Sequence, residues 1–256
     1  MVGLDREGVA AGRPNFMTAE PFAVGATCVL DEHAARHKRV LRLDSGALVG
    51  VRDGQGHVGA GHLVRLTKTQ AHIHIRDVEV IAPLPAVHLL VPVADRDRML
   101  WLAEKACELG CTSWRPVLWR RSRSVSPRGE GVVFQQKVLA RMTSALAQSE
   151  GAWLPQPFPE ATLERALLAA PPGDRVVLDP AGAPMVGSTA TALQEPMVLA
   201  IGPEGGIEAD ELKALVAAGF RPVRLGPTIL RFETAAVAAL AIARTALGAI
   251  STTRES

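Results

Sequence analysis

The C-terminal quarter of the chain, residues 197–249, constrains the fold more than any other stretch of the sequence. Two Gly-Pro segments lie in it, at residues 197–206 and 225–234. Each combines a short apolar run with a Gly-Pro break, a pattern that predicts a buried strand ending in a loop. We expect two neighbouring parallel strands whose loops meet at the carboxyl edge of one sheet, which is where open α/β sheets bind ligands.

A helix is predicted between the two segments, at residues 208–219. Acidic residues occupy its first turn, where they suit the positive end of the helix dipole. Gly219 stands at its end, the position at which glycine commonly terminates a helix.

Composition excludes several classes of protein. With 256 residues the chain can form two domains of unequal size, and no apolar run approaches the ~18 residues of a membrane-spanning helix. The first residues lack the basic start and apolar stretch of a signal peptide. Three cysteines, an odd number, argue against a disulfide framework and favour the cytoplasm. A formal net charge of +2 does not by itself indicate a nucleic-acid binder.

The N-terminal third predicts a small β domain. Residues 1–15 are rich in Gly and Ala and are expected to form a mobile tail. Strands are expected at residues 26–30, 47–52, 57–66 and 71–81, with a helix at 32–42 and a hairpin turn at Asp53-Gly54. Short strands of this kind favour a barrel over residues 16–82.

Residues 82–85, Ala-Pro-Leu-Pro, are the expected linker, because two prolines interrupt both helix and strand. The α/β domain is then expected over residues 86–251. Its predicted strands are 87–93, 113–119 and 175–178, and its predicted helices are 95–109, 132–149, 161–170 and 233–250. The last helix is apolar nearly all round, which predicts burial in the domain or at a subunit interface.

Histidine and cysteine pairs offer little chemistry. His72 and His74 share one face of a strand and His62 is a possible neighbour, but no acid or cysteine completes a metal-ligand spacing. We therefore expect polar positions on a β-sheet and no metal. Cys107 and Cys111 are spaced unlike a Cys-x-x-Cys motif and are interpreted as small buried hydrophobes.

Two clusters of basic residues are candidates for RNA binding. Phosphate contacts need Lys or Arg, and an aromatic ring can stack on an unpaired base. A solvated face is the simpler reading of any charge run, but Trp114 and Trp119 are interleaved with the second cluster. The clusters comprise Arg36, Lys38, Arg39 and Arg42, and then Arg115, Arg120, Arg121, Arg123 and Arg128.

The first Gly-Pro segment is not a phosphate loop. Gly202-Pro-Glu-Gly-Gly206 lacks the Lys and the Ser or Thr of that motif, so a neutral or zwitterionic ligand held by main-chain groups is favoured. Two tight turns with nothing bound would explain either loop alone. That explanation weakens because polar residues gather in the same two loops, namely Glu204, Arg231, Glu233 and Thr234.

These segments resemble a known family. Ile201-Gly-Pro-Glu-Gly-Gly206 and Leu225-Gly-Pro-Thr-Ile-Leu-Arg-Phe-Glu-Thr-Ala235 are similar to the paired C-terminal signature of SPOUT RNA methyltransferases. More narrowly they resemble the RsmE family, which makes 3-methyluridine in small-subunit (16S) ribosomal RNA. Supporting matches are His37-Lys-Arg-Val-Leu-Arg42, Lys105-Ala-Cys-Glu-Leu-Gly110 and Ala147-Gln-Ser149, and the resemblance covers residues 20–250.

The resemblance implies a PUA-like β-barrel that binds RNA, followed by a SPOUT domain with a C-terminal trefoil knot. It also implies a homodimer, ribosomal RNA as partner, no membrane, and S-adenosyl-L-methionine as cofactor. The implied cofactor-binding residues are Leu199, Ile201, Gly202, Gly205, Leu225, Gly226, Ile229 and Leu230. Glu204, Arg231 and Glu233 are implied to act on the methyl group and the uracil, with one carboxylate as the base and Arg231 as the cation.

Two positions depart from the family pattern. Gly151 and Thr228 stand where the family usually has Arg, and both arginines are plausible RNA contacts. The departures leave open three functions: methylation of uridine N3, methylation of another RNA position by the same fold, and RNA binding without catalysis. Methylation of uridine N3 is the main hypothesis.

Overall fold

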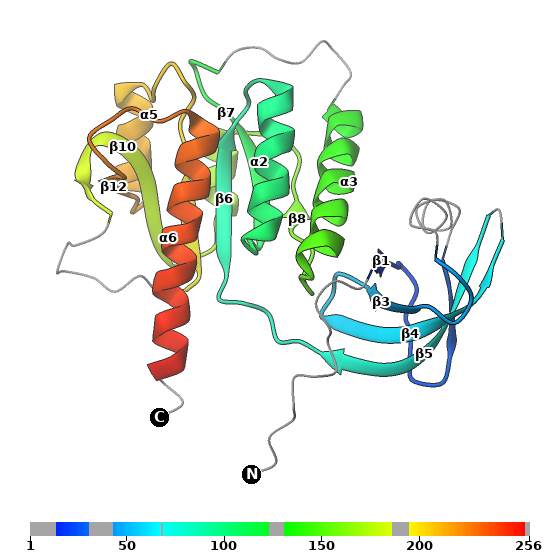
Figure 1. The fold of residues 1–256 in the computed structure, drawn as a ribbon. Helices are drawn as coiled ribbons and strands as arrows, with labels where there is room; N and C mark the ends of the chain where they lie inside the picture. Colours follow the sequence, from blue (N-terminus) through cyan, green and yellow to red (C-terminus); the bar gives the residue numbers. More distant parts are fainter. Residues whose placement is uncertain (1–13, 31–42, 68, 123–130, 186–194, 254–256) are drawn as a thin grey trace. The chain divides into compact units, whose positions relative to one another are not determined.

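Figure 1 presents the computed structural model, which describes residues 14–30, 43–67, 69–122, 131–185 and 195–253. The chain separates into two compact units. The first contains Met1–Pro83 together with Leu146–Trp153, and the second contains Leu84–Ala145 together with Leu154–Ser256. The predicted helix at residues 32–42 and most of the predicted N-terminal tail lie outside the described residues.

The first unit is a curled sheet in the order β1-β3-β4-β5-β2. Strand β1 runs parallel to β3, and the other neighbours are antiparallel. The strands are β1 (Asn15–Met17), β2 (Thr27–Leu30), β3 (Leu48–Arg52), β4 (His57–Leu66) and β5 (Ala71–Val80). The strands predicted at 26–30, 47–52, 57–66 and 71–81 are confirmed, since alternate residues such as Ala71, Ile73 and Ile75 are fully buried on one face.

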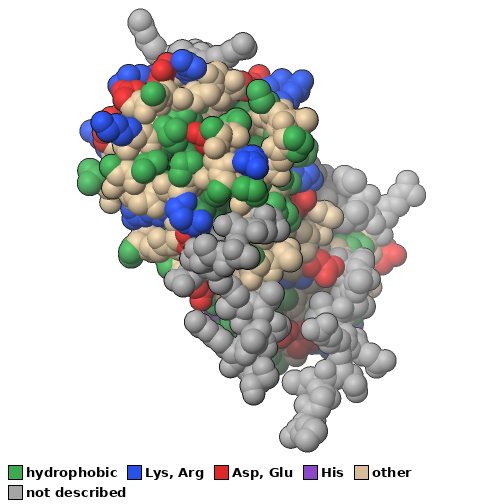
Figure 2. All heavy atoms as spheres, turned by 90° about the vertical axis from the view of Figure 1, so that its left-hand side faces the viewer, with side chains coloured by type: hydrophobic (Ala, Val, Ile, Leu, Met, Phe, Trp, Pro, Cys, Tyr) green, Lys and Arg blue, Asp and Glu red, His purple; other side chains and the backbone are tan. Residues whose placement is uncertain are grey.

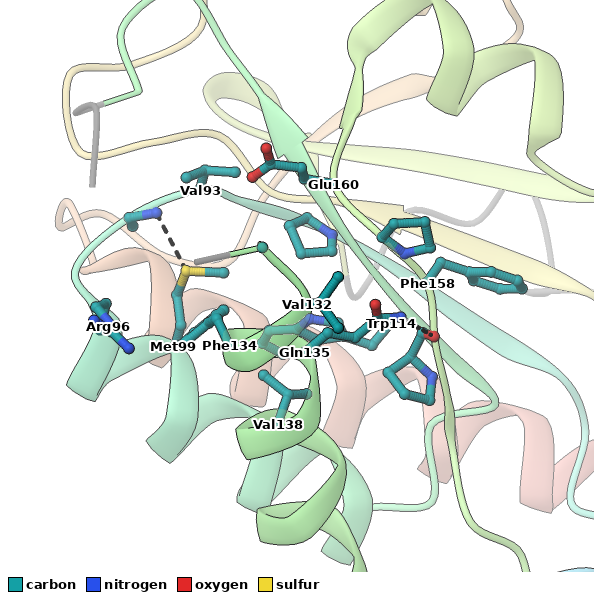
Figure 3. A pocket seen from close by; sticks show the side chains of 15 residues that line it. Val93, Arg96, Met99, Trp114, Val132, Phe134, Gln135, Val138, Phe158 and Glu160 are labelled. Atoms are coloured by element: carbon teal, nitrogen blue, oxygen red, sulfur yellow. Dashed lines mark hydrogen bonds between the residues drawn. The ribbon is translucent and has the colours of Figure 1, made fainter. Parts of the chain in front are cut away.

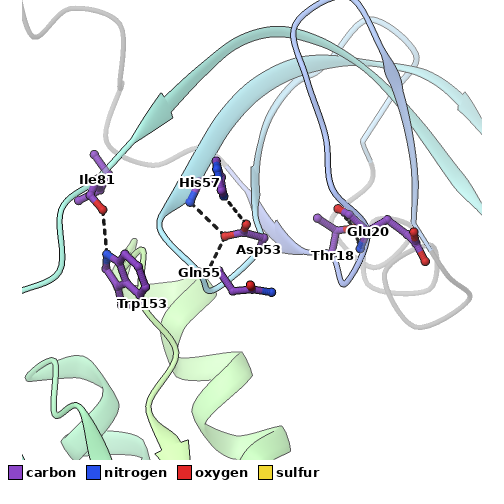
Figure 4. A network of polar contacts seen from close by, with 7 residues as sticks. All are labelled: Thr18, Glu20, Asp53, Gln55, His57, Ile81 and Trp153. Atoms are coloured by element: carbon purple, nitrogen blue, oxygen red, sulfur yellow. Dashed lines mark hydrogen bonds and ion pairs between the residues drawn. The ribbon is translucent and has the colours of Figure 1, made fainter.

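The predicted turn at Asp53 is confirmed, and its side chain organises it. Oδ1 of Asp53 accepts hydrogen bonds from the backbone N–H groups of Gln55 at 2.7 Å and His57 at 3.0 Å, as Figure 4 shows. Oδ2 lies 2.6 Å from Nδ1 of the same histidine. Gly54 adopts a φ of +72°, which residues with a side chain rarely adopt, so the Asp-Gly pair fits this hairpin.

Residues 146–153 belong to the first unit because they are tied to its sheet. Nη1 of Arg52 donates to the carbonyls of Glu150 at 2.7 Å and Gly151 at 3.1 Å. Nε1 of Trp153 donates to the carbonyl of Ile81 at 2.8 Å. These contacts explain why a segment far along the sequence joins a domain built from the first 83 residues.

The second unit is a parallel sheet in the order β12-β10-β11-β6-β7-β8, with β9 also paired to β7. The strands are β6 (Val87–Pro92), β7 (Ser113–Leu118), β8 (Gln156–Pro157), β9 (Ala161–Thr162), β10 (Asp174–Pro184), β11 (Met197–Ala200) and β12 (Arg221–Arg224). All four residues of β11 are buried, as expected for a parallel strand with both faces covered.

Helices cover both faces of this sheet. On one face α4 (Leu163–Ala169) and α5 (Ala209–Ala217) contribute Leu163, Ala166 and Leu215 to a core cluster with Val117 and Val198. On the other, α2 (Arg96–Glu108) contacts α6 (Phe232–Thr253), which packs on β6 and β11 (Figure 1). The remaining helix is α3 (Gly131–Ser149). Among the described residues, no helix is both long and apolar enough to cross a membrane.

The predicted helices of the described part are confirmed. Asp95 caps α2 by accepting from the N–H of Arg98 at 3.1 Å, and Gly110 follows it with a φ of +69°. At α5, Glu208 and Glu211 form a capping box, in which each carboxylate accepts from backbone near the start of the helix. The helix predicted at 161–170 is shorter, because its first two residues form β9 instead.

One prediction about the sheet is wrong. The strands before the two Gly-Pro loops are not neighbours, because β10 pairs with β11 on one side and with β12 on the other. The second strand is also β12 at Arg221–Arg224, which ends before the Gly-Pro pair at 226–227. Strand order is set by the crossover connections, which the periodicity of single segments does not encode. Both loops nevertheless leave the carboxyl edge of the same sheet.

Candidate active site

The first loop, residues 201–208, leads from β11 into α5 and is tightly packed. A Cβ built on Gly202 would lie 2.5 Å from Cγ1 of Ile207, closer than real Cβ contacts. Gly206 has a φ of +82°, a conformation that favours glycine. The glycines are therefore needed for close approach and for turning, which explains the Gly-Pro-Glu-Gly-Gly sequence without a phosphate.

Arg121, which follows β7, holds the first loop from outside. Its Nε lies 2.6 Å from Oε1 of Glu208, and its Nη1 donates to the carbonyl of Gly205 at 2.8 Å. A Cβ on Gly205 would lie 3.0 Å from Cβ of Arg121, so little room exists for any larger residue. The side chain predicted to bind RNA is thus engaged with the loop in this structure.

The second loop, residues 225–231, leads from β12 into α6 and is far more open. The side chain of Ile229 is 88% exposed and that of Leu230 is 36% exposed. A Cβ on Gly226 would meet nothing within 4 Å. Figure 2 views the side of the molecule that carries α5 and β12, where apolar side chains lie among those of Arg and Lys.

A third wall comes from an irregularity in β10. Its register with β12 shifts between Leu178 and Ala183, so the residues between them leave the regular pairing. Asp179 and Pro180 face the space between the two loops as a result. A Cβ on Gly182 would lie 2.5 Å from the backbone of Pro222, so glycine permits this close approach.

Together the two loops and the β10 irregularity enclose a pocket of about 410 Å³, here called the edge pocket. Its lining combines apolar side chains, glycine backbone and two carboxylates. Seven of the eight residues predicted to bind a cofactor line it: Ile201, Gly202, Gly205, Leu225, Gly226, Ile229 and Leu230. The eighth, Leu199, is fully buried in β11 and is not part of the lining. Thr228, which departs from the family pattern, also lines the edge pocket.

The predicted catalytic residues occupy different positions around the edge pocket. Glu204 lines it and is exposed. Glu233, at the start of α6, is buried and is not part of the lining. Arg231 is exposed just before α6, and its carbonyl accepts from the N–H of Ala235 at 2.9 Å.

Arg98 connects the two carboxylates. Its Nη1 lies 2.7 Å from Oε1 of Glu204, and its Nε lies 3.8 Å from Oε1 of Glu233. The arginine comes from the first turn of α2, whereas the carboxylates come from the first loop and from α6. One guanidinium thus joins α2 to two elements that line the edge pocket, the first loop and α6.

The second oxygen of Glu233 has an unusual environment. Oε2 is buried and has no hydrogen-bond partner among the residues that the structure describes. A buried carboxylate oxygen without a donor is costly, and such groups concentrate at sites that bind or react. Glu233 therefore retains an unused acceptor close to the start of α6.

The basic clusters are only partly described. Arg36, Lys38, Arg39, Arg42, Arg123 and Arg128 lie outside the described residues. Arg120 forms an ion pair with Asp210, and its backbone N–H donates to Oε1 of Glu211 at 2.8 Å. Its side chain and that of Arg121 thus contact the start of α5, and an RNA-binding role for either stays a prediction.

The thiols of Cys107 and Cys111 are unreactive at neutral pH. Burial raises the pKa of Cys107 to about 12, and burial raises the pKa of Cys111 even further. Both thiols are protonated at neutral pH and therefore poor nucleophiles. The described residues contain no group of three or more His, Cys, Asp or Glu side chains that would hold a metal ion.

Sequence reasoning missed three polar residues of the site, Arg98, Asp179 and Arg224. Asp179 directly follows the apolar run predicted as a strand, and an acid at a strand end was a usable signal. Arg98 carried no such signal, since basic residues near the start of a helix usually face solvent. Only the packing of α2 beside the first loop brings it to Glu204.

Comparison with known proteins defines the class to which this fold and site belong. Residues 82–244 match the RNA methyltransferase domain family, and this region is most of the second unit. The chain is also 31% identical over 214 residues to ribosomal RNA small subunit methyltransferase E of Synechocystis, covering 80% of this chain and 68% of that protein. The chain belongs to this family of RNA methyltransferases.

Further relatives point to the same member of the family. Ribosomal RNA small subunit methyltransferase E of Mycobacterium bovis is 29% identical over 236 residues, covering 84% of this chain and 85% of that protein. The crystal structure of the enzyme of that name from Neisseria gonorrhoeae, bound to S-adenosyl methionine, superposes with a TM-score of 0.84. That structure is 28% identical and covers 91% of this chain and 97% of its own.

Proposed function

We propose that this protein transfers the methyl group of S-adenosyl-L-methionine to N3 of a uridine in small-subunit ribosomal RNA. The observation that carries the proposal is the edge pocket, where a glycine loop, an open apolar loop and a carboxylate from a third element converge. The relatives named for small-subunit ribosomal RNA methylation, and the related structure bound to S-adenosyl methionine, support both substrate and cofactor.

The edge pocket fits the proposed cofactor in size and chemistry. Its volume of about 410 Å³ falls within the range of about 300–1,000 Å³ typical of small-molecule sites. Ile201, Leu225 and Leu230 offer apolar contact for a purine ring, and the glycine backbone offers donors and acceptors for its edge. The Asp179 carboxylate can accept from ribose hydroxyls. When bound, S-adenosylmethionine supplies an electrophilic methyl group on a sulfonium.

Glu204 is the better placed of the two carboxylates to act as a base. Methylation of N3 requires that the uracil lose its N3 proton before or during attack. Glu204 lines the edge pocket, whereas Glu233 lies outside its lining. We therefore assign proton acceptance to Glu204 and a supporting role to Glu233, which holds Arg98 from the side of α6.

Two arginines complete the proposed site. Arg231 is exposed at the entrance to α6, where it can stabilise negative charge that spreads to O2 and O4 of the uracil. Arg98 acts through Glu204 and is a positioning residue, because its contact at 2.7 Å fixes the carboxylate. Since methyl transfer is an in-line displacement, such positioning supplies much of the catalysis.

The family resemblance also extends to features beyond the site. We infer a C-terminal trefoil knot, a PUA-like barrel over residues 16–82, a SPOUT domain over residues 86–251 and a homodimer. We further infer that the barrel and its basic residues bind RNA in the cytoplasm, and that the substrate is the ribosomal RNA, free or in the assembled small subunit. The partly exposed Ala238, Ala241 and Ile242 share one face of α6 and would suit a helix interface between subunits.

Mapping of modified nucleosides tests the proposal directly. Small-subunit ribosomal RNA from a strain that lacks the gene should lose one 3-methyluridine, and the purified protein with S-adenosylmethionine should restore it. Methylation at another position would show the same fold with a different target. Binding of the RNA without any methyl transfer would indicate a protein that has lost catalysis.

A further inference from the structure

A second pocket lies in the second unit, between the first turns of α2 and α3 and strand β7. It has a volume of about 200 Å³ and is here called the aromatic pocket. Figure 3 shows its side chains, which come from the segment between β6 and α2, from α2, α3 and β7, and from β8 and the segment after it. None of the residues assigned to the edge pocket lines it.

The aromatic pocket concentrates rings in a chain that has few. The whole sequence contains four Trp, six Phe and no Tyr, and three of these aromatic residues, Trp114, Phe134 and Phe158, line this one pocket. Pro116, Pro157 and Pro159 add flat apolar surfaces. Since drug-sized ligands need about 300–1,000 Å³, a pocket of about 200 Å³ suits a single small ring system.

Trp114, in the wall of this pocket, has a buried donor without a partner among the described residues. Trp114 is 1% exposed, and its Nε1 makes no hydrogen bond with any described residue. An indole N–H that is buried normally finds an acceptor. That N–H has no exposed surface in this structure, so the aromatic pocket offers a ligand the faces of its rings and not this donor.

Positive charge accompanies two of the rings. The guanidinium carbon of Arg96 lies 5.5 Å from the centroid of the Phe134 ring, and that of Arg115 lies 4.4 Å from the centroid of the Phe158 ring. Burial lowers the pKa of Arg115, but an arginine stays charged at neutral pH. Rings for stacking beside cations for phosphates are the combination that binds single-stranded nucleic acid.

The aromatic pocket is linked to the edge pocket through α2. Arg96 lines the aromatic pocket, and Arg98, two residues later, contacts Glu204 in the edge pocket. We propose that the aromatic pocket binds one unstacked base of the RNA substrate that flanks the methylated nucleotide, an inference that rests on the proposed function.

Indole resonances provide the first test, because the protein contains a matched internal control. Trp119 is also buried, and its Nε1 also lacks a partner among the described residues, but it packs in the core on the opposite face and does not line the aromatic pocket. The full chain, labelled with ¹⁵N and saturated with S-adenosylhomocysteine, would be titrated with each nucleoside 5′-monophosphate. The Trp114 indole signal, assigned with Trp114→Phe, should move saturably while that of Trp119 stays still. No movement of Trp114, or equal movement of both, would overturn the proposal.

A pair of substitutions on α3 provides the second test. Val132 lines the aromatic pocket and is 69% exposed, whereas its neighbour Val133 is 48% exposed and lies outside the lining. Val132→Trp should fill the pocket and raise the dissociation constant for small-subunit ribosomal RNA about tenfold, the size expected for one lost stacking contact. Val133→Trp should leave it unchanged.

The two tests separate the possible outcomes. Movement of Trp114 with mononucleotides, together with unchanged RNA binding by Val132→Trp, would indicate a free-nucleotide site and contradict the proposal. Because both readouts measure binding, they remain valid if methyl transfer itself is absent. In that case the proposed function would be wrong, while the base-binding pocket would still be supported. Intact methylation with no movement of the Trp114 signal would instead support the proposed function and contradict the base-binding pocket.

Discussion

The two loops that form the edge pocket differ in how firmly the protein holds them. The loop at residues 201–208 is fixed at three points, by Ile207 against Gly202, by the Arg121 side chain, and by the capping box of α5. The loop at residues 225–231 exposes 88% of the Ile229 side chain and leaves open space around Gly226. Two loops with similar Gly-Pro sequences therefore have opposite packing.

This difference suggests a division of labour between the loops. Segments with few buried contacts belong to the less stable end of a structure, and binding regions are often drawn from that end. We infer that the first loop is a preorganised wall and that the second adapts to the bound cofactor. Ile229 and Leu230 would then lose much of their exposure when the site fills.

The largest effect is expected from the second loop, at Arg231. Arg231→Ala should lower the single-turnover rate of methyl transfer by about 10²–10³, the cost of removing one group that stabilises developing charge. The thermal midpoint should not change, because the side chain is exposed. Arg221→Ala is the matched control, since that exposed arginine pairs with Asp174 away from the site and should retain activity. Near-normal turnover by Arg231→Ala would remove this residue from the chemistry.

A pair of glycine substitutions tests the contrast in packing. Gly202→Ala would drive a methyl group into Ile207, destabilising the protein by about 1–3 kcal/mol. The displaced wall should also lower activity about tenfold to a hundredfold. Gly226→Ala should cost little stability, because no protein atom lies within 4 Å of the new methyl group. Denaturant unfolding compares the two variants and methyl transfer assays measure the loss in Gly202→Ala; equal destabilisation by the two substitutions would refute the contrast.

Substitution of Arg98 tests whether the first loop, the rigid wall of the edge pocket, depends on its contact with α2. Arg98→Ala should lower kcat about tenfold and leave the dissociation constant for S-adenosylmethionine unchanged, because the residue positions Glu204 and does not line the edge pocket. Arg98→Lys should recover part of the loss, since a charge on α2 can still reach the carboxylate. A loss of cofactor binding in Arg98→Ala, with no rescue by lysine, would indicate a purely structural role.

Much of the local structure followed from the sequence. Period-two alternation located β5, and caps such as Asp95 and Gly110 located α2 within a residue at each end. The glycine signature located the edge pocket, because small residues and Gly-Pro breaks restrict the backbone directly. These features depend on neighbours in the chain, which a single sequence contains.

Apart from the shifted bounds of α4 and β12, the errors and omissions concern distant parts of the chain. The insertion of β10 between β11 and β12 was not predicted, because strand order depends on crossovers. The irregularity that brings Asp179 to the edge pocket, and the contact of Arg98 with Glu204, likewise require the assembled sheet. The aromatic pocket was missed for the same reason, as its rings come from three separated segments.

The smallest predicted effect is a pH dependence of stability caused by His88, in the sheet from which both loops emerge. His88 on β6 lies 2.7 Å from Oγ of Ser113, and burial, followed by the charge of Arg244, lowers the pKa of its imidazole below the usual 6.5. As pH falls below 6.5, the unfolded chain therefore takes up a proton that the folded chain does not, and stability is lost until pH reaches the lowered value.

Thermal midpoints recorded from pH 7.5 to pH 5.5, a range that extends about one unit either side of the ordinary histidine pKa, would measure this loss of stability. His88→Gln should flatten that part of the profile relative to the unchanged protein. An identical slope in both would assign the pH dependence to other groups.

Hydrogen exchange with and without S-adenosylmethionine tests the central claim most directly. We expect amides at residues 201–208 to exchange slowly even without the cofactor, and those at residues 225–231 to exchange rapidly and gain the greater protection when it binds. Unchanged exchange in both loops, or protection confined to another part of the chain, would contradict a cofactor site formed by one fixed and one adaptable loop.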